Sequence, residues 1–292
     1  MRNAFIKLHI SVLLAGFTGI LGKLIELAEG PLVWYRILIT LVLFFLYLWA
    51  RGKLPRIPLR EVVKICGVGS LVALHWIFFY GSIKYANVSI GVVCFATVGF
   101  FTAILEPFFS RTRISLREVL FSLITVAGIA LIFHFDARYR TGIILGLLSA
   151  VLATFFTISI KRVGARHAST TMLFYQLVGG LIFLSLAAPA YLALFPGLKL
   201  VPGAWDFFYL FLLASACTIG MFLLQIQSLE KISAFTVNLS FNLEPVYSIV
   251  LAMIFFNEAS EVNFSFFIGL GMICLSVLLQ TLYAMRQRGN SP

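Results

Sequence analysis

The sequence predicts an all-α integral membrane protein with about ten transmembrane helices, arranged as two inverted five-helix repeats. Hydrophobic residues make up 61% of the chain and charged residues only 11%, whereas about one quarter of a soluble domain is charged. Apolar runs close to the roughly 20 residues that a membrane crossing requires recur along the chain. In addition, a stretch of sequence around Trp34 returns about 140 positions later.

Ten apolar runs are long enough to be membrane spans. The first run follows Arg2, but it is too long for a secretory signal and lacks a small-residue cleavage site, so we expect it to be retained as a helix. The connections are short, and no soluble domain is expected between the spans. The expected spans are residues 5–27, 31–50, 65–84, 88–109, 116–134, 142–160, 170–190, 206–228, 233–256 and 264–284.

The chain contains an internal duplication. Leu32–Ile37 in the second run matches Met172–Leu177 in the seventh run at an offset of 140 positions. Gly81–Ala86 matches Gln227–Ile232 at an offset of 146 positions. The two offsets differ because the loops between the matched segments differ in length.

The offset of 146 decides how the fourth and ninth runs align. It places Gly99 over Pro245, in the interior of both runs. A competing register would match Leu105–Pro107 with Leu243–Pro245. That register pairs the end of one span with the middle of another, so we regard the match as coincidental.

The duplication divides the chain into a first repeat of residues 1–140 and a second repeat of residues 141–292, which form one membrane domain. Because each repeat contains an odd number of spans, equivalent helices cross the membrane in opposite directions. Inverted repeats of this kind are typical of secondary transporters, which rock around a site between the two halves.

The formal charge of +11 is distributed in a way that indicates membrane topology rather than nucleic-acid binding. With a cytoplasmic N-terminus, sixteen of the 22 lysine and arginine residues fall in cytoplasmic segments and four in the opposite loops. The other two, Lys23 and Arg36, lie within spans. This excess predicts a multi-pass protein of the plasma (inner) membrane with both termini in the cytoplasm. The basic loops would contact anionic lipid headgroups.

The four cysteines, Cys66, Cys94, Cys217 and Cys274, fall inside expected spans, and no two have CxxC spacing. We therefore expect buried, small hydrophobic side chains rather than disulfides or a metal site. No motif in the sequence calls for a cofactor.

Motifs in three spans match those of a known family. They are Pro31–Arg36, His75–Tyr80 with Ser82, and Glu244–Tyr247 followed by Asn257-Glu258. Together with the number, length and duplication of the spans, they resemble the drug/metabolite transporter superfamily, in particular its ten-helix EamA-type members. The resemblance implies two inverted five-helix repeats, a central cavity, and export of amino acids or related small metabolites.

The chain departs from the family pattern at three places. It has Gly99 where the fourth span often has proline, Phe17 where the first span often has tryptophan, and Asn257-Glu258 where Gly-Glu often follows the ninth span. Gly99 can still supply a flexible point in the fourth span, and we therefore expect it to have a gating role.

Four ionisable residues within the expected spans stand out, because a charge in lipid is costly and such a residue normally faces a cavity or a partner. Glu244 lies about 11 residues into the ninth span, roughly 16 Å deep at 1.5 Å per residue and therefore near the midplane. Pro245 removes a helix hydrogen bond beside it. We expect Glu244 to bind a substrate ammonium group or to carry a coupling proton. The alternative is a structural glutamate paired with a neighbouring helix at the kink.

The other three ionisable residues have open roles. His75, near the middle of the third span, is either a substrate contact that relays protons or a neutral histidine bonded between helices. For Arg36 we favour a structural or gating role, snorkelling or binding backbone carbonyls, over a bidentate clamp on a substrate carboxylate. Its repeat partner is the neutral Gln176. Lys23 is expected to snorkel at the outer end of the first span and to pair with Glu26.

Uncharged residues complete the expected substrate site. Asn242, Gln176 and Gln225 are candidate polar contacts, and Trp76 and Tyr247 are candidates for an apolar lining. Hydrogen bonds between helices are the alternative role for the amides, and filling of core or lipid-facing space is the alternative for the rings.

We expect a secondary transporter that exports amino acids or related small metabolites by alternating access through a central cavity. Protons are a candidate coupling ion, and facilitated diffusion is equally compatible with the sequence. The alternatives are an intramembrane enzyme and a lipid flippase or channel subunit. An enzyme is not favoured, because the chain has no HExxH, GxSxG or P-loop motif and no second midplane carboxylate beside Glu244.

Overall fold

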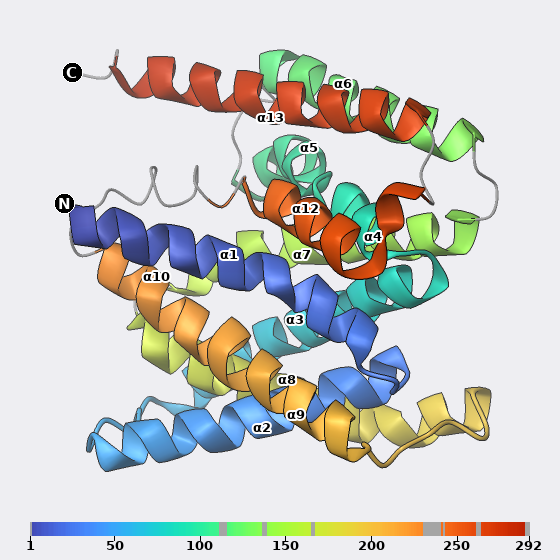
Figure 1. Cartoon of the computed structure of the whole chain (residues 1–292). Helices are drawn as coiled ribbons and strands as arrows, with labels where there is room; N and C mark the ends of the chain where they lie inside the picture. The colour runs from blue at the N-terminus through green and yellow to red at the C-terminus, as the bar shows by residue number, and fades with distance from the viewer. Residues whose placement is uncertain are drawn as a thin grey trace.

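The computed structural model of the chain describes residues 2–110, 116–135, 139–164, 167–229, 241, 243–260 and 264–289. Within these ranges every regular element is a helix (Figure 1). The elements are α1 (Arg2–Leu24), α2 (Glu29–Ala50), α3 (Leu59–Tyr85), α4 (Val88–Phe95), α5 (Val98–Ser110), α6 (Leu116–Phe135), α7 (Arg140–Gly164), α8 (Ser169–Leu194), α9 (Ala204–Ala214), η2 (Ser215–Gly220), α10 (Met221–Leu229), α12 (Glu244–Phe256), η3 (Glu258–Ser260) and α13 (Phe264–Gly289).

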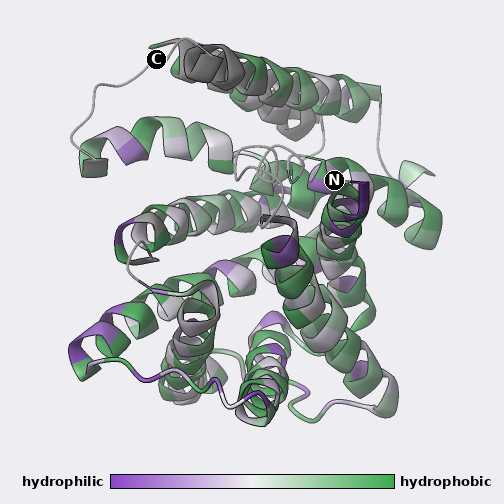
Figure 2. Cartoon of the chain, turned by 90° about the vertical axis from the view of Figure 1, so that its left-hand side faces the viewer, coloured by the Kyte–Doolittle hydropathy of each residue, from purple (hydrophilic) through white to green (hydrophobic). Residues whose placement is uncertain are grey.

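Nine of the ten expected spans correspond to helices or to consecutive helices of the structure. Of the expected ninth span, residues 244–256 form α12, while residues 233–240 and 242 lie outside the described part of the chain. Among the described residues, seven helical segments are long and apolar enough to cross a membrane, and shorter apolar helices lie at Glu244–Phe256 and Phe264–Ser276. Much of the length of the helices is coloured as hydrophobic in Figure 2. The prediction of an all-α membrane protein is therefore confirmed.

The helices form a layered bundle (Figure 1). At one edge α6 packs against α13, and α2, α8 and α9 form the opposite edge. Between these edges, α1 contacts α10 and α12, while α7 contacts α3, α4 and α5. The start of α1 and the end of α13 lie on the same side of the bundle, as an even number of crossings requires.

Two expected spans are interrupted. The fourth span separates into α4 and α5 at Ala96 and Thr97, where the Thr97 hydroxyl donates to the Cys94 carbonyl at 2.6 Å. The eighth span contains the π-helical segment η2 between α9 and α10. Hydropathy predicts a continuous helix in both places, because an apolar run carries no signal for a local change in backbone hydrogen bonding.

α5 and α12 support the offset of 146 between the repeats. Both helices are 13 residues long, and they begin 146 positions apart, at Val98 and Glu244. Pro245 lies in the first turn of α12, where its missing N–H leaves no helix hydrogen bond unmade. Gly99 lies in the first turn of α5, so the break in the fourth span precedes this expected flexible point.

Small residues bring α3 and α8 into backbone contact in the first half of each helix. A Cβ atom added to Gly69 would collide with the backbone of Gln176, and one added to Gly179 would collide with the backbone of Cys66. The Cys66 thiol also donates to the Tyr175 carbonyl at 3.4 Å. Toward their C-terminal ends the two helices line opposite sides of a cavity.

All four cysteines are free, and their burial differs. Cys94 and Cys217 are buried and Cys66 is half-buried, as expected for small hydrophobic side chains. Cys274 is exposed on α13, so the expectation of four buried cysteines is wrong at this position. The reason is that α13 lies at an edge of the bundle, where part of its surface has no helix to cover it.

Candidate functional site

Arg36 forms the centre of a polar cluster inside the bundle. Its side chain on α2 is 2% exposed and donates to Tyr80 Oη of α3 at 2.7 Å and to Thr218 Oγ1 of η2 at 3.1 Å. The guanidinium also lies 4.0 Å from the ring centroid of Trp76, which is a cation–π contact. One side chain thus joins three segments that are far apart in the sequence.

The π-helical segment η2 positions Thr218 toward Arg36. The Thr218 hydroxyl donates to the carbonyl of Leu213, five residues earlier, at 2.8 Å. A π-helical turn shifts the side chains relative to a regular α-helix, and such turns are frequent at functional sites. Because its proton is directed to Leu213, the Thr218 oxygen is available to accept from Arg36.

Arg36 forms no ion pair with the described residues. Its Nε is buried without a hydrogen-bond partner, and no carboxylate in the described part of the chain forms an ion pair with the guanidinium. The expectation of snorkelling or of carbonyl binding is wrong, because the side chain stays inside and binds hydroxyl groups and a ring. An unpaired buried charge is costly, and such residues usually mark a substrate or ion pathway.

Glu244 is the carboxylate that interacts electrostatically with Arg36. It is half-buried at the first position of α12, and its carboxylate accepts no hydrogen bond within the described ranges. The positive end of the helix dipole at this position favours a carboxylate. No described residue therefore occupies this carboxylate, which leaves it available there to a ligand or a proton.

His75 bridges α3 and α7. Its side chain is 7% exposed, and Nδ1 lies 2.8 Å from Ser149 Oγ and 3.1 Å from the Ser149 carbonyl oxygen. The Ser149 hydroxyl donates to the His75 carbonyl at 3.2 Å, so Nδ1 is the donor toward Ser149. The ring also stacks on Phe95, with centroids 5.0 Å apart. This geometry is that of a helix-bridging histidine.

The expected amide contacts are dispersed. Gln176 on α8 is 6% exposed, and its Nε2 has no hydrogen-bond partner among the described residues. Arg36 and Gln176, which are equivalent in the duplication, thus both carry a buried N–H group without a partner there. Gln225 on α10 is half-buried. Asn242 lies outside the described residues.

Two of the expected residues lie away from Arg36. Tyr247 on α12 lines an open groove of about 540 Å³ together with α1 residues such as His9 and Leu13. Gly99 is exposed on α5. Of the two expected aromatic residues, only Trp76 contacts the polar cluster.

Lys23 pairs with Glu258 rather than with Glu26, so the expected local ion pair is wrong. Lys23 Nζ lies 2.8 Å from Glu258 Oε1. The Glu258 carboxylate also accepts from the backbone N–H groups of Val88 at 3.0 Å and Ser89 at 2.9 Å. Sequence reasoning did not assign Glu258 a role, although a charged residue directly after an apolar helix, at the Asn257-Glu258 motif, is a usable signal.

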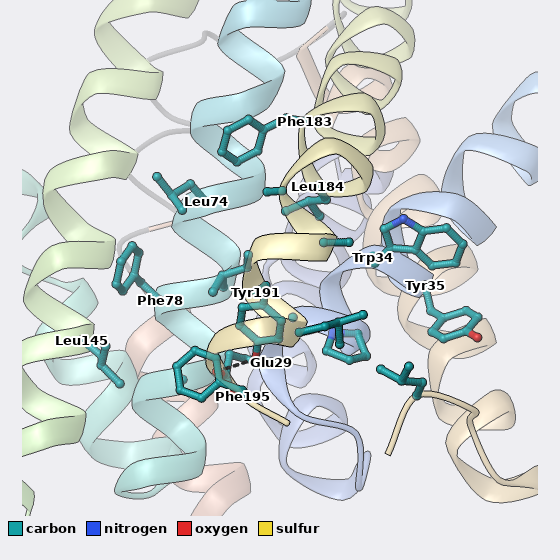
Figure 3. A pocket seen from close by; sticks show the side chains of 18 of the residues that line it. Glu29, Trp34, Tyr35, Leu74, Phe78, Leu145, Phe183, Leu184, Tyr191 and Phe195 are labelled. Atoms are coloured by element: carbon teal, nitrogen blue, oxygen red, sulfur yellow. Dashed lines mark hydrogen bonds between the residues drawn. The ribbon is translucent and has the colours of Figure 1, made fainter. Parts of the chain in front are cut away.

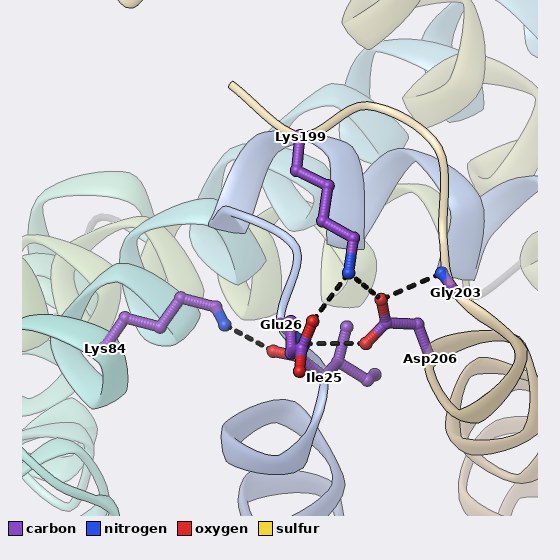
Figure 4. Close-up of polar contacts among 6 residues, drawn as sticks. All are labelled: Ile25, Glu26, Lys84, Lys199, Gly203 and Asp206. Carbon is purple, nitrogen blue, oxygen red and sulfur yellow. Dashed lines mark hydrogen bonds and ion pairs between the residues drawn. The ribbon is translucent and has the colours of Figure 1, made fainter. Parts of the chain in front are cut away.

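Glu26 belongs instead to a network that joins two loops at the same end of the bundle (Figure 4). Lys199 Nζ lies 2.6 Å from Glu26 Oε2 and 3.0 Å from Asp206 Oδ2. The Asp206 carboxylate accepts from the N–H groups of Glu26 at 2.7 Å and Gly203 at 3.0 Å. These hydrogen bonds tie the connection between α1 and α2 to the start of α9.

The apolar helices and the buried polar cluster define a polytopic α-helical membrane protein. Among the described residues, no group of three His, Cys, Asp or Glu side chains could hold a metal ion. The chain belongs to the EamA-like transporter family, whose model matches residues 3–134 and 140–282. It is therefore a membrane transporter of small molecules.

The comparison with solved structures concerns the fold alone. A chain whose title reads only "Crystal structure of protein" is 18% identical, with a TM-score of 0.63. The similarity covers 98% of this protein and 99% of that chain. No curated protein matches the sequence.

Proposed function

We propose that this transporter is a secondary carrier that exports amino acids or related small metabolites by alternating access. The observation that carries the proposal is that, among the described residues, neither Arg36 nor Glu244 forms an ion pair. Arg36 has a buried Nε without a partner in the described structure, and Glu244 accepts no hydrogen bond there. An amino acid offers a carboxylate to the first group and an ammonium to the second, in charge-assisted hydrogen bonds.

The proposed architecture is a pair of inverted repeats, residues 1–140 and 141–292. Equivalent helices support it, since α2 and α8 begin 140 positions apart and α5 and α12 begin 146 positions apart. The contacts of α1 with α10 and α12 also correspond to those of α7 with α3 and α5. α5 begins directly after a helix break, and broken helices in such repeats commonly border the substrate site.

Proton coupling is assigned to Glu244 rather than His75. Among the described residues no group donates a hydrogen bond to the Glu244 carboxylate, whereas His75 Nδ1 is committed to Ser149. We further propose an inner-membrane location with both termini in the cytoplasm, on the basis of the basic residues in the loops.

Counterflow in proteoliposomes tests the proposed function. Vesicles preloaded with one unlabelled amino acid or related metabolite at a time would receive the labelled compound outside, with protein-free vesicles as the control. We expect transient accumulation for at least one compound with both a carboxylate and an ammonium group. Folded protein that gives no accumulation across the panel would refute the proposed substrate class.

A further inference from the structure

α2, α3, α7 and α8 surround a pocket of about 640 Å³ at the end of the bundle where α2 and α7 begin (Figure 3). The pocket exists because α3 and α8 touch at Gly69 and Gly179 and separate from there toward their C-terminal ends. None of the residues of the Arg36 cluster lines it. It is therefore a site separate from the proposed substrate site.

Among the described residues that line the pocket, one carries a charge, Glu29 at the start of α2. Tyr191 Oη donates to Glu29 Oε1 at 3.0 Å (Figure 3). The second carboxylate oxygen accepts no hydrogen bond from the described residues. Gly81 leaves room beside this carboxylate, since a Cβ atom there would lie 3.8 Å from Glu29 Cγ.

Aromatic rings line the pocket on both sides of the carboxylate. The Tyr191 and Phe195 rings lie beside Glu29 with centroids 5.0 Å apart, and Phe78 and Phe183 line the pocket farther from it (Figure 3). Ring faces attract organic cations, and the attraction is strongest where water is excluded. The remaining walls are mostly aliphatic, so the pocket suits a largely apolar molecule.

The charges around the pocket favour a cation over a phospholipid. Within the described part of the chain, the lining residues include no lysine, arginine or histidine that would bind a phosphate group. Lys84 interacts electrostatically with Glu29, but its ammonium donates to the Ile25 carbonyl at 2.7 Å and the residue does not line the pocket. An anionic headgroup at this end would be repelled by the Glu29 carboxylate, and no basic residue among the described lining residues would offset that repulsion.

We propose that this pocket binds an amphipathic organic cation, with its charged centre at Glu29 and its apolar body between α3 and α8. An occupant of this kind holds the two helices apart at one end while the glycine contact holds them together farther along. α3 also carries Trp76 and Tyr80, which contact Arg36. The site is therefore placed to influence transport, although its existence does not depend on the identity of the transported substrate.

Binding of radiolabelled tetraphenylphosphonium to the purified full-length protein tests the proposal. The Glu29→Gln variant is decisive, because glutamine can still accept from Tyr191 but carries no charge. We expect saturable binding to the wild type and about tenfold weaker binding to Glu29→Gln. The tenfold loss is the size expected when one charge–charge contact is removed at a half-buried site. Ala187→Phe, which fills the pocket from α8, should abolish binding.

The matched control is Glu26→Gln, which removes a carboxylate at the same end of the bundle but outside the pocket. We expect it to bind like the wild type, and so should Glu244→Gln. Loss of binding in Glu244→Gln with normal binding in folded Glu29→Gln would assign the cation to the Arg36 cluster and overturn the proposal. Equal binding of tetraphenylborate, an anion of the same shape, would identify an uncharged apolar groove and overturn it as well.

Discussion

Lys23 and Glu258 form an ion pair of 2.8 Å although they lie 235 positions apart in the chain. The same carboxylate accepts from the first N–H groups of α4, those of Val88 and Ser89. A carboxylate at a helix N-terminus is stabilised by the helix dipole and by these otherwise unmade bonds. Glu258, which is fully buried, thus joins the end of α1, the start of α4 and the segment after α12.

Glu258→Gln should lower the stability of the folded protein by about 2 kcal/mol, because charge-assisted bonds to three donors are replaced by weaker neutral ones. Burial raises the pKa of Glu258, but hydrogen bonds from Lys23 and from the Ser89 and Val88 amides outweigh it and lower the pKa below its ordinary value. The stabilisation is therefore complete above the unfolded-state pKa of about 4.5 and is lost as the pH falls through the folded-state pKa.

Thermal unfolding of the purified protein in detergent between pH 7 and pH 3.5 measures this effect. The melting temperatures of wild type and Glu258→Gln should differ at pH 7, and the difference should shrink as the pH falls below about 4.5. Glu26→Gln serves as the control, since its side chain is 76% exposed and an exposed ion pair contributes little. If the difference in melting temperature between wild type and Glu258→Gln stayed constant from pH 7 to pH 3.5, the charge of Glu258 would not be what stabilises the fold.

Gly69→Ala should destabilise the protein, whereas Gly67→Ala should not. A Cβ atom at Gly69 would collide with the Gln176 backbone, while one at Gly67 would meet no atom within 4 Å. Both glycines lie in α3, where alanine is intrinsically better by about 1 kcal/mol. The collision forces α3 and α8 apart and costs about 1–3 kcal/mol, as overpacking does. Comparison of the two melting temperatures checks this, and equal values would show that the helices do not pack this closely.

The fold was predictable because its signals are local. Apolar runs of about 20 residues and the repeated segment around Trp34 place the helices, and the offset of 146 reappears in the starts of α5 and α12. The interruptions at Thr97 and in η2 were not predictable, since they depend on hydrogen bonds to particular carbonyls rather than on hydropathy.

The partners of the buried polar residues could not be predicted from the sequence. A buried role for Arg36 follows from its position in a span, but its partners Tyr80 and Thr218 lie 44 and 182 positions away and are set by the tertiary fold. For the same reason Lys23 pairs with the distant Glu258 and not with Glu26, its neighbour in sequence. The sequence also contains no signal for the pocket at Glu29, because that pocket results from the divergence of α3 and α8.

Glu244→Gln should abolish proton-driven accumulation of substrate and weaken substrate binding, because the ammonium group loses its charged partner, so counterflow should persist only at higher substrate concentration. Glutamine keeps the size and hydrogen-bonding capacity of the side chain but cannot take up or release a proton. Accumulation under an imposed pH gradient should fall to the level of protein-free vesicles, and exchange between equal substrate pools should continue at the higher substrate concentration. Glu61→Gln, at the start of α3 and outside the polar cluster, is the matched control. Normal gradient-driven accumulation in Glu244→Gln would remove the proton-carrier role.

Arg36→Met separates a ligand-binding role of the arginine from a structural one. If Arg36 serves the substrate, its replacement removes an unpaired buried charge, so the melting temperature should stay the same or rise. Affinity for a carboxylate substrate found by counterflow should then fall about 100-fold, the equivalent of one lost charge-assisted hydrogen bond of about 3 kcal/mol. Arg36→Lys keeps the charge but loses the planar contacts to Tyr80, Thr218 and Trp76, so it should bind more weakly than the wild type and more tightly than Arg36→Met. A large drop in melting temperature for Arg36→Met, with unchanged affinity in the protein that folds, would instead assign Arg36 to holding α2, α3 and η2 together.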